Sequence, residues 1–398
     1  SGANGENYFL ITRATDTAYN VESLQAERPF TIDSTTPTLT TIKPVSNTYY
    51  QKSSLVTISG TSVDLAGTNA GKFNNNPVNV CFKRIADEKY WDNIDKKWQG
   101  KTDLELLERW LPWSTANWTF YDVAVATAGY WSFEIAESSW TSGQQYMVWV
   151  GVNDQATNKI DYTEAQIQGG TGGVLFYCDN EAPVTDVQDP PNGSYLNDVS
   201  APAAHIWGNC DEMPTKESPP YNAGNKYTYL KIKRDPTLGA EWFVSGAWVA
   251  GENWTEIIPW IDTWTYSGFN ETKMTHGTTY WIYVYATDNA YPPPGNTEST
   301  GGNIKSLFLY DTQAGTSTIS VPPTGEPHYK SLTTISGTCY DDFSSPDKVF
   351  VEIFDDTDAT LYYSTNGWTT TQNYFETGGL QPWTTSWTTN IWTNHHRY

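Results

Sequence analysis

The chain has 398 residues, enough for about two to four ordinary domains, and its 45 acidic and 23 basic residues give a formal charge of −22. This balance argues against nucleic-acid binding, because few Lys and Arg side chains are present to neutralise phosphate. No run of 18 apolar residues occurs, which argues against a membrane-spanning helix, and the 15% aromatic content argues against disorder.

Residues 1–32 are predicted to form two strands that have no sandwich of their own. Apolar and polar residues alternate here with the period of two that is typical of a β-strand. The residues expected to take part are Tyr8, Phe9, Leu10, Ile11, Phe30 and Ile32.

Three segments that follow repeat the same features in the same order. Each opens at an aspartate (Asp33, Asp179 or Asp311) and then has an Ile-x-Gly motif, at 58–60, 206–208 and 335–337. An alternating strand, an aromatic hairpin and a Trp-rich stretch come next in all three. Many short strands in a long repeat predict a β-sandwich, with an all-β chain of another topology as the alternative. One short helix is expected near 102–110, with Thr102 as its candidate N-cap.

The end of the repeat indicates that the third sandwich is split. Stretches 143–154 and 277–288 both run from Gly to Asp through alternating apolar residues, and the matching stretch for the third repeat is 5–16, at the other end of the chain. The expected parts are 1–32 as the last two strands of the split domain, 33–178 as domain 1 with aromatic insertions, 179–310 as domain 2, and 311–398 as an incomplete domain 3.

Residues 8–38 and 58–64 together resemble bacterial immunoglobulin-like repeats of large cell-surface and adhesin-like proteins. The family has an Ala-x-Asp-x-Ala-Gly-Asn turn before a strand that ends Asp-x-Thr-x-Pro, and ISGTSVD at 58–64 matches its second strand. Tyr19 stands where the family usually has Gly, and Pro292–Pro294 enlarges the second turn. The resemblance implies an all-β chain of tandem immunoglobulin-like sandwiches and an extracellular habit, but no biochemical activity.

The sequence contains no signature of catalysis. A nucleophile elbow, HExxH, a P-loop and a dinucleotide fingerprint are all missing, so we do not expect an enzyme. The abundant Trp and Tyr side chains have two interpretations, namely packing and subunit interfaces, or stacking on sugars. Their recurrence in all three repeats favours packing.

Calcium is the one cofactor expected. Acidic turns and linkers recur at one place in each repeat, beside the domain junctions, and calcium accepts irregular cages of oxygen ligands. The candidate ligands are Asp16, Asn20, Asp33, Asp154, Asn158, Asp179, Asp288, Asn296 and Asp311. The alternative is that these residues only cap tight turns by bonding to their own backbone.

Two covalent features are also expected. Cys178 precedes the linker into domain 2 and Cys210 ends a strand near that linker, which predicts a Cys178–Cys210 disulfide, with isolated buried thiols as the alternative. Four sequons predict N-glycosylation, at Asn117, Asn192, Asn253 and Asn270. Together with the acidity they favour an extracellular or cell-surface location.

These features predict a structural subunit of an extracellular filament, stalk or surface assembly. A sandwich that lacks its last two strands exposes an unpaired edge, which the N-terminal segment of a neighbouring identical subunit would complete, head to tail. One alternative is that the chain is a single period of a longer polypeptide. Another is an adhesin or carbohydrate-binding repeat array of a larger cell-surface protein, with glycans as partners.

Overall fold

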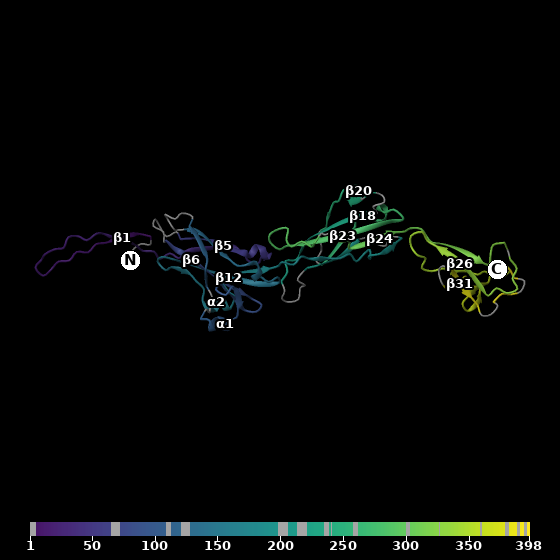
Figure 1. Ribbon diagram of the computed structural model, residues 1–398, viewed down its shortest axis with the longest axis horizontal. Coiled ribbons are helices and arrows are strands. Elements are labelled where there is room, and N and C mark those ends of the chain that lie inside the picture. The colour runs from purple at the N-terminus through teal and green to yellow at the C-terminus, as the bar shows by residue number, and fades with distance from the viewer. Residues whose placement is uncertain are drawn as a thin grey trace.

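Figure 1 presents the computed structural model of the chain, an elongated row of β-domains. The structure describes residues 5–64, 72–108, 113–120, 128–197, 206–212, 221–234, 239, 241–257, 262–299, 303–325, 327–358, 360–378, 382–387, 391–393 and 396–398. No helix in these ranges is long and apolar enough to span a bilayer.

The N-terminal segment forms a two-stranded hairpin that runs out from one end of the row (Figure 1). Strand β1 (Asn7–Leu10) pairs antiparallel with β2 (Arg28–Thr31), and neither pairs with any other described strand. Because this hairpin packs on no core, most of its side chains are exposed.

Residues 33–178 form domain 1, which has two sheets. Their strand orders are β10-β11-β5-β3 and β4-β14-β12-β6-β7-β8, with β13 on β12 and β9 on β6. These orders match the D-E-B-A sheet of an immunoglobulin sandwich and its G-F-C sheet (β14-β12-β6), which is extended here by β4 on one side and by β7 and β8 on the other. The strands are β3 (Thr38–Lys43), β4 (Tyr49–Tyr50), β5 (Thr57–Val63), β6 (Phe73–Arg84), β7 (Lys89–Asp92), β8 (Lys97–Gln99), β9 (Ser114–Thr115), β10 (Asn117–Phe120), β11 (Ala128–Glu134), β12 (Gln144–Asp154), β13 (Lys159–Ile160) and β14 (Val174–Cys178).

Two short helices cover the outer face of the second sheet of domain 1. They are α1 (Lys101–Leu106) and α2 (Glu164–Gln168), and their Leu104 and Ile167 side chains are buried in one small cluster with Trp149 of the sheet. The N-cap of helix α1 is Gly100, two residues before the predicted Thr102, which lies inside the helix. The short 3₁₀ turns in the described chain are η1 (Lys52–Val56), η3 (Glu137–Ser139) and η5 (Glu271–Lys273).

Residues 179–310 form domain 2 with the same plan. Its sheets have the orders β15-β17-β22 and β16-β24-β23-β18-β19-β20, with β21 on β18. The strands are β15 (Val184–Thr185), β16 (Ser194–Leu196), β17 (Ile206–Asp211), β18 (Asn225–Arg234), β19 (Glu241–Val244), β20 (Ala247–Ala250), β21 (Thr255–Ile257), β22 (Thr263–Tyr266), β23 (Thr278–Asp288) and β24 (Ser306–Tyr310).

Domain 3 keeps the first sheet of this plan and only part of the second. The first sheet has the order β25-β26-β31, and two small pairs, β27-β30 and β28-β29, stand where domain 2 has its larger sheet. The strands are β25 (Thr316–Val321), β26 (Thr334–Tyr340), β27 (Phe350–Val351), β28 (Tyr362–Ser364), β29 (Gly367–Thr369), β30 (Phe375–Glu376) and β31 (Trp383–Ser386).

The repeated Ile-x-Gly motif has the same packing role in each domain. Its glycine is paired with a buried Trp on the neighbouring strand, as Gly60 with Trp131, Gly208 with Trp264 and Gly337 with Trp383. A Cβ atom at Gly208 would lie 2.0 Å from the carbonyl oxygen of Asp186, so a side chain does not fit there. The motif therefore marks the place where the first strand, the second strand and the Trp ring meet in each core.

Candidate functional site

The N-terminal hairpin has the geometry of the last two strands of domains 1 and 2. Its Tyr8 pairs with Phe30, just as Tyr146 pairs with Phe176 in domain 1 and Tyr280 with Phe308 in domain 2. The paired rings are stacked with centroids 5.4, 5.7 and 5.2 Å apart and interplanar angles of 26°, 24° and 23°. The hairpin therefore has the same pairing and ring stacking as the last two strands of domains 1 and 2.

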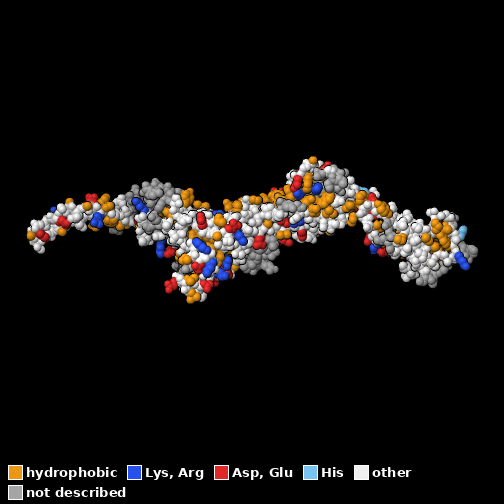
Figure 2. Space-filling view, in the orientation of Figure 1, with side chains coloured by type: hydrophobic (Ala, Val, Ile, Leu, Met, Phe, Trp, Pro, Cys, Tyr) orange, Lys and Arg blue, Asp and Glu red, His pale blue; other side chains and the backbone are white. Residues whose placement is uncertain are grey.

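The hairpin differs from these strand pairs in its burial. Phe176 and Phe308 are fully buried, whereas 47% of the Phe30 surface is exposed. Leu10 is 56% exposed, although Ile282, at the same position of domain 2, is 0% exposed. Figure 2 shows apolar side chains along this isolated hairpin. Of the predicted residues, Tyr8, Phe9, Leu10 and Phe30 lie in the strand pair, and Ile11 and Ile32 lie one residue beyond its strands. The inner face of this pair packs on no core.

Domain 3 has the complementary feature, an open sheet edge. In domain 2, strand β18 pairs with β23 on one side and with β19 and β21 on the other. In domain 3, β27 occupies the position of β18 and pairs with β30, the counterpart of β21. No strand within the described part of domain 3 pairs with the opposite edge of β27.

A groove of about 600 Å³ lies beside this edge, at the junction of domains 2 and 3. Phe350 of β27 and Val349, directly before β27, line the groove. Cys339 of β26, Asp341 directly after β26, and Asp311 of the linker also line it. Phe350 of β27 is 57% exposed, so a large apolar side chain lies at the surface beside the groove.

The last residue of the chain lies at one end of the same edge. The Tyr398 hydroxyl accepts a hydrogen bond from the Thr393 backbone N–H at 2.7 Å, and Tyr280 in domain 2 accepts from Thr275 in the same way, also at 2.7 Å. The Tyr398 ring stacks on Trp368, the counterpart of Trp248, which contacts Tyr280. Tyr398 therefore occupies the position that Tyr280 holds in domain 2.

A second kind of site lies where each linker enters its domain. In domain 1, carboxylate oxygens of Asp33, Asp64 and Asp154 all lie within 4.8 Å of one another. Asp64 is completely buried and neither of its carboxylate oxygens has a hydrogen-bond partner. Burial raises the pKa of Asp64 to about 7, and repulsion from Asp33 and Asp154 adds to the shift.

Domain 2 has the same cluster at equivalent positions. Asp179, Glu212 and Asp288 bring their carboxylate oxygens within 4.8 Å, and all three residues are buried. Both oxygens of Glu212 lack a hydrogen-bond partner. Burial raises the pKa of Glu212 to about 9 and that of Asp179 to about 7, with Asp288 repelling both carboxylates. Lys226 attracts the Asp288 carboxylate, but burial outweighs that attraction and the pKa of Asp288 is still raised.

The predicted Asp–Asn turns have a well-defined part in these clusters. Asn158 donates from its amide nitrogen to Asp154 Oδ2 at 2.8 Å and to the Asp33 backbone oxygen at 3.3 Å. Asn296 makes the equivalent bonds to Asp288, at 2.7 Å, and to Asp179, at 3.1 Å. The Asn side chains therefore turn NH₂ groups toward the cluster and clamp the turn to the linker, which corrects their prediction as oxygen ligands.

The same turn is present in the free hairpin. Asn20 donates its backbone and amide N–H groups to the Asp16 carboxylate, both at 2.9 Å. The residue before the Asn is left-handed in both turns, with φ of 67° at Tyr19 and 72° at Thr157. This explains why glycine suits that position in similar repeats.

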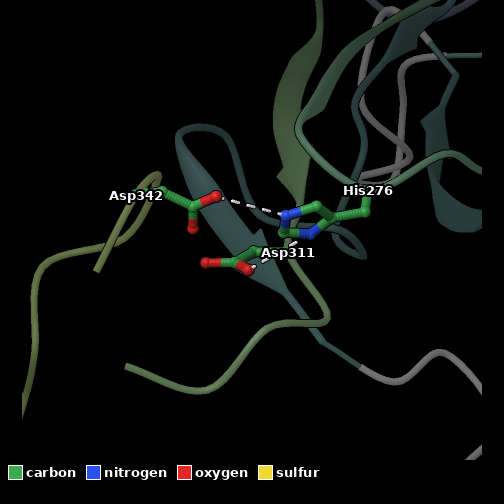
Figure 3. Close-up of side chains that lie close together, drawn as sticks. All are labelled: His276, Asp311 and Asp342. Atoms are coloured by element: carbon green, nitrogen blue, oxygen red, sulfur yellow. Dashed lines mark ion pairs between the residues drawn. The ribbon is translucent and has the colours of Figure 1, made fainter. Parts of the chain in front are cut away.

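Asp311, the remaining predicted ligand, has different neighbours (Figure 3). The His276 ring lies between Asp311 and Asp342, with Nδ1 and Nε2 each 3.5 Å from a carboxylate oxygen. His276 Nδ1 also accepts a hydrogen bond from the Thr312 backbone N–H, and Phe343 packs edge-on against the ring. These contacts link domain 2 to domain 3. Asp341, at the position of Asp64 and Glu212, lines the groove beside Asp311.

The predicted Cys178–Cys210 disulfide is wrong in this structure. Cys178 is a buried thiol in the core of domain 1 and Cys210 is a buried thiol in the core of domain 2. The strand that carries each cysteine directs its side chain inward to its own core, so the two sulfurs do not face each other. Burial raises the pKa of both thiols to about 12.

The sequons and several Trp residues can also be located. Asn117, Asn192 and Asn253 are exposed and Asn270 is half-buried, which leaves glycosylation a prediction. Trp264 and Trp383 are buried strand residues, and Trp113, Trp118, Trp387 and Trp392 pack against cores, as the packing interpretation predicts. Trp110 and Trp260 lie outside the described residues.

Comparison with known proteins identifies no family for this chain. No family model matches the chain, and no curated protein matches it. A solved structure titled "Marsupial T cell receptor" is similar with 5% sequence identity and a TM-score of 0.31, over 81% of this chain and 87% of that one. The strand orders themselves place this protein among all-β chains of tandem immunoglobulin-like domains.

Proposed function

We propose that the protein is a structural, non-enzymatic subunit that associates head to tail, with the N-terminal hairpin of one copy completing domain 3 of another. The observation that carries the proposal is the match between hairpin and edge. The hairpin repeats the register and ring stacking of β23 and β24, and β27 has an open edge where β23 would lie. We further propose that the assembly is an extracellular filament, stalk or surface layer.

The register of domain 2 specifies the expected pairing. Leu230 and Ile232 of β18 pair with Val284 and Ile282 of β23. Transferred to the split domain, Val351 faces Thr12 and Ile353 faces Leu10. Each insertion buries the apolar inner face of a hairpin and supplies backbone partners to an open edge, as in other cases of strand addition.

The placement of the two features supports an open chain of copies. The hairpin and domain 3 lie at opposite ends of the elongated molecule (Figure 1). A contact between two different surfaces of identical copies propagates without limit unless the rotation closes a ring. Tyr398 is a competitor for this edge, because it occupies the place that Tyr8 would take, and insertion requires it to leave.

The test is electron microscopy of the purified protein combined with denaturing electrophoresis. Fibres whose material dissolves to a band near the 44.6 kDa of one chain support separate subunits. Fibres that give only a much larger band indicate successive periods of one polypeptide. A protein that remains monomeric at high concentration, with the hairpin still exposed, would contradict the proposal.

One observation favours the alternative of an adhesin or carbohydrate-binding array. On the larger sheet of domain 2, Tyr229 stacks on Tyr285 with centroids 4.8 Å apart, and Trp254 packs edge-on against Tyr285. All three side chains are partly exposed. Quenching of Trp fluorescence by soluble oligosaccharides, lost in Trp254→Ala, would support that function.

A further inference from the structure

The two buried carboxylate clusters cannot be understood as hydrogen-bonded networks. Asp64 in domain 1 and Glu212 in domain 2 are more than nine-tenths buried and use none of their four carboxylate oxygens in a hydrogen bond. Each faces two further carboxylates at less than 4.8 Å. A buried charge that faces like charges is very unfavourable unless an opposite charge joins it.

We propose that a divalent cation of the calcium class binds each of these clusters, and that a third such site forms only between two copies, from Asp311 and Asp341 of one and Asp16 of the other. The third site rests on the proposed function, because it requires the hairpin to enter domain 3. The first two sites do not, because every ligand belongs to one domain.

The chemistry of the clusters selects the class of cation. The ligands offered by the clusters of domains 1 and 2 are all carboxylate oxygens, and neither cluster contains a histidine or cysteine. Hard oxygen donors without nitrogen or sulfur suit calcium or magnesium rather than zinc or copper. Three carboxylates at the meeting point of a linker, a strand end and a turn form an irregular cage, which calcium tolerates better than magnesium.

The sequence positions of Asp64 and Glu212 identify the corresponding residue of the third site. They follow the glycine of the Ile-x-Gly motif by four residues, and the residue at that place in domain 3 is Asp341. Asp311 corresponds to the linker residues Asp33 and Asp179. The turn aspartate, the counterpart of Asp154 and Asp288, is Asp16, and it lies on the hairpin at the other end of the molecule.

The Asp16–Asn20 turn of the hairpin is already folded in the unassembled chain. Its Asp16–Asn20 turn has the same hydrogen bonds as the Asp154–Asn158 turn, including the bond from the Asp16 backbone N–H to the Asn20 oxygen at 3.0 Å. Asp311 and Asp341 line the groove beside the open edge. Insertion of the hairpin in the register of domain 2 brings Asp16 to this end of the groove. Without a cation, three carboxylates would meet there and oppose insertion; with one, binding and assembly favour each other.

The first experiment counts calcium ions on the full-length chain by native mass spectrometry. The variant Leu10→Asp keeps the chain unassembled, and in it we expect two ions per chain. Asp64→Asn and Glu212→Gln should each remove one, and the double variant both. Asp161→Asn, which removes an exposed carboxylate paired with Lys159, is the control and should retain two. A double variant that binds as many ions as its parent, or a parent that binds none at millimolar calcium, overturns the proposal.

Thermal melting distinguishes lost ligands from misfolding. In chelator, Asp64→Asn should melt at or above the parent temperature, because it removes a buried repulsive charge, and calcium should no longer raise its melting temperature through domain 1. A variant that melts far below the parent both with and without calcium would be misfolded. Ion counting on the Glu212→Gln variant then tests whether the carboxylate clusters bind calcium.

The second experiment measures association of the natural chain by light scattering, with calcium or with chelator. We expect calcium to increase association at least tenfold, with three ions per assembled copy, and Asp341→Asn to abolish the increase. Asp358→Asn, an exposed carboxylate of the same domain, is the control. Association that is independent of calcium, with two ions per copy, would overturn the shared site and leave the proposed function intact. Two ions per chain without association at any calcium concentration would overturn the proposed function and leave the first two sites intact.

Discussion

Domains 2 and 3 share one plan through the fifth strand of the sandwich and then differ. Domain 2 pairs β18, which carries Ile232 and Leu230, with β23, whereas no described strand of domain 3 pairs with the matching edge of β27. The hairpin β1-β2 shows the reverse, two correctly paired strands without a core. The comparison teaches that half of a sandwich can keep its local geometry when the partner half is elsewhere, because turn chemistry and cross-strand pairs act locally.

The largest effect should come from the hairpin. Leu10→Asp places a charge on the face that would enter domain 3, and we expect association between copies to fall by more than a hundredfold, because burying an unpaired carboxylate is costly. Sedimentation velocity measures this. The matched control Ile94→Asp changes an exposed residue of domain 1 and should associate normally. Equal association of both variants would mean that the hairpin takes no part.

A pair of core substitutions compares the two domains directly. Ile232→Ala in domain 2 should lower the free energy of unfolding of that domain by about 2–5 kcal/mol, the usual cost of such a cavity. Ile353→Ala, at the same position of domain 3, should cost less than half as much in unassembled protein, and the full amount after assembly. Chemical denaturation of the unassembled and assembled forms measures both. Equal costs in the unassembled form would show that domain 3 is already complete.

Tyr398 should slow the entry of the hairpin. Tyr398→Ala removes the ring from the place that Tyr8 is expected to take, and we expect the association rate to rise several-fold. Stopped-flow light scattering gives the rate, and Tyr374→Ala, an exposed Tyr of the same domain, is the control. A slower rate in Tyr398→Ala would mean that this ring belongs to the edge in the assembled form as well.

The smallest effect concerns two cysteines at matching positions. Cys210 is enclosed by a complete domain, and burial raises its pKa to about 12, so its thiolate is scarce at pH 8. Cys339 is also buried, at 4% exposure, but it lines the groove beside the edge of β27. Iodoacetamide should therefore label Cys339 before Cys210 in unassembled protein, and assembly should slow the labelling of Cys339 alone. Peptide mapping follows both sites.

The repeat and the pairing of the two N-terminal strands could be predicted because short-range sequence patterns specify them. The period of two in 5–16, the Ile-x-Gly motif and the Asp–Asn turn each specify local structure. The carboxylate clusters could be predicted only in part, since Asp64 and Glu212 gain their significance from burial, which depends on all three elements that meet there. The signal in the sequence that points to Asp64 and Glu212 is their constant spacing from the glycine of the Ile-x-Gly motif. The disulfide prediction failed because proximity along the chain does not tell toward which core a strand turns its side chain.

The measurement that tests the central claim most directly is a crosslink between two chains. Opposed residues on antiparallel strands lie about 4.5–5.5 Å apart at Cα, which suits a disulfide. One chain carries Thr12→Cys and the other Val351→Cys, and the control pair replaces the first by Arg13→Cys, whose side chain points to the opposite face. We predict that mixing the first pair under mild oxidation gives a disulfide-linked dimer on a non-reducing gel, and that the control pair does not. Equal yields from both pairs, or none from either, would contradict insertion of the hairpin in this register.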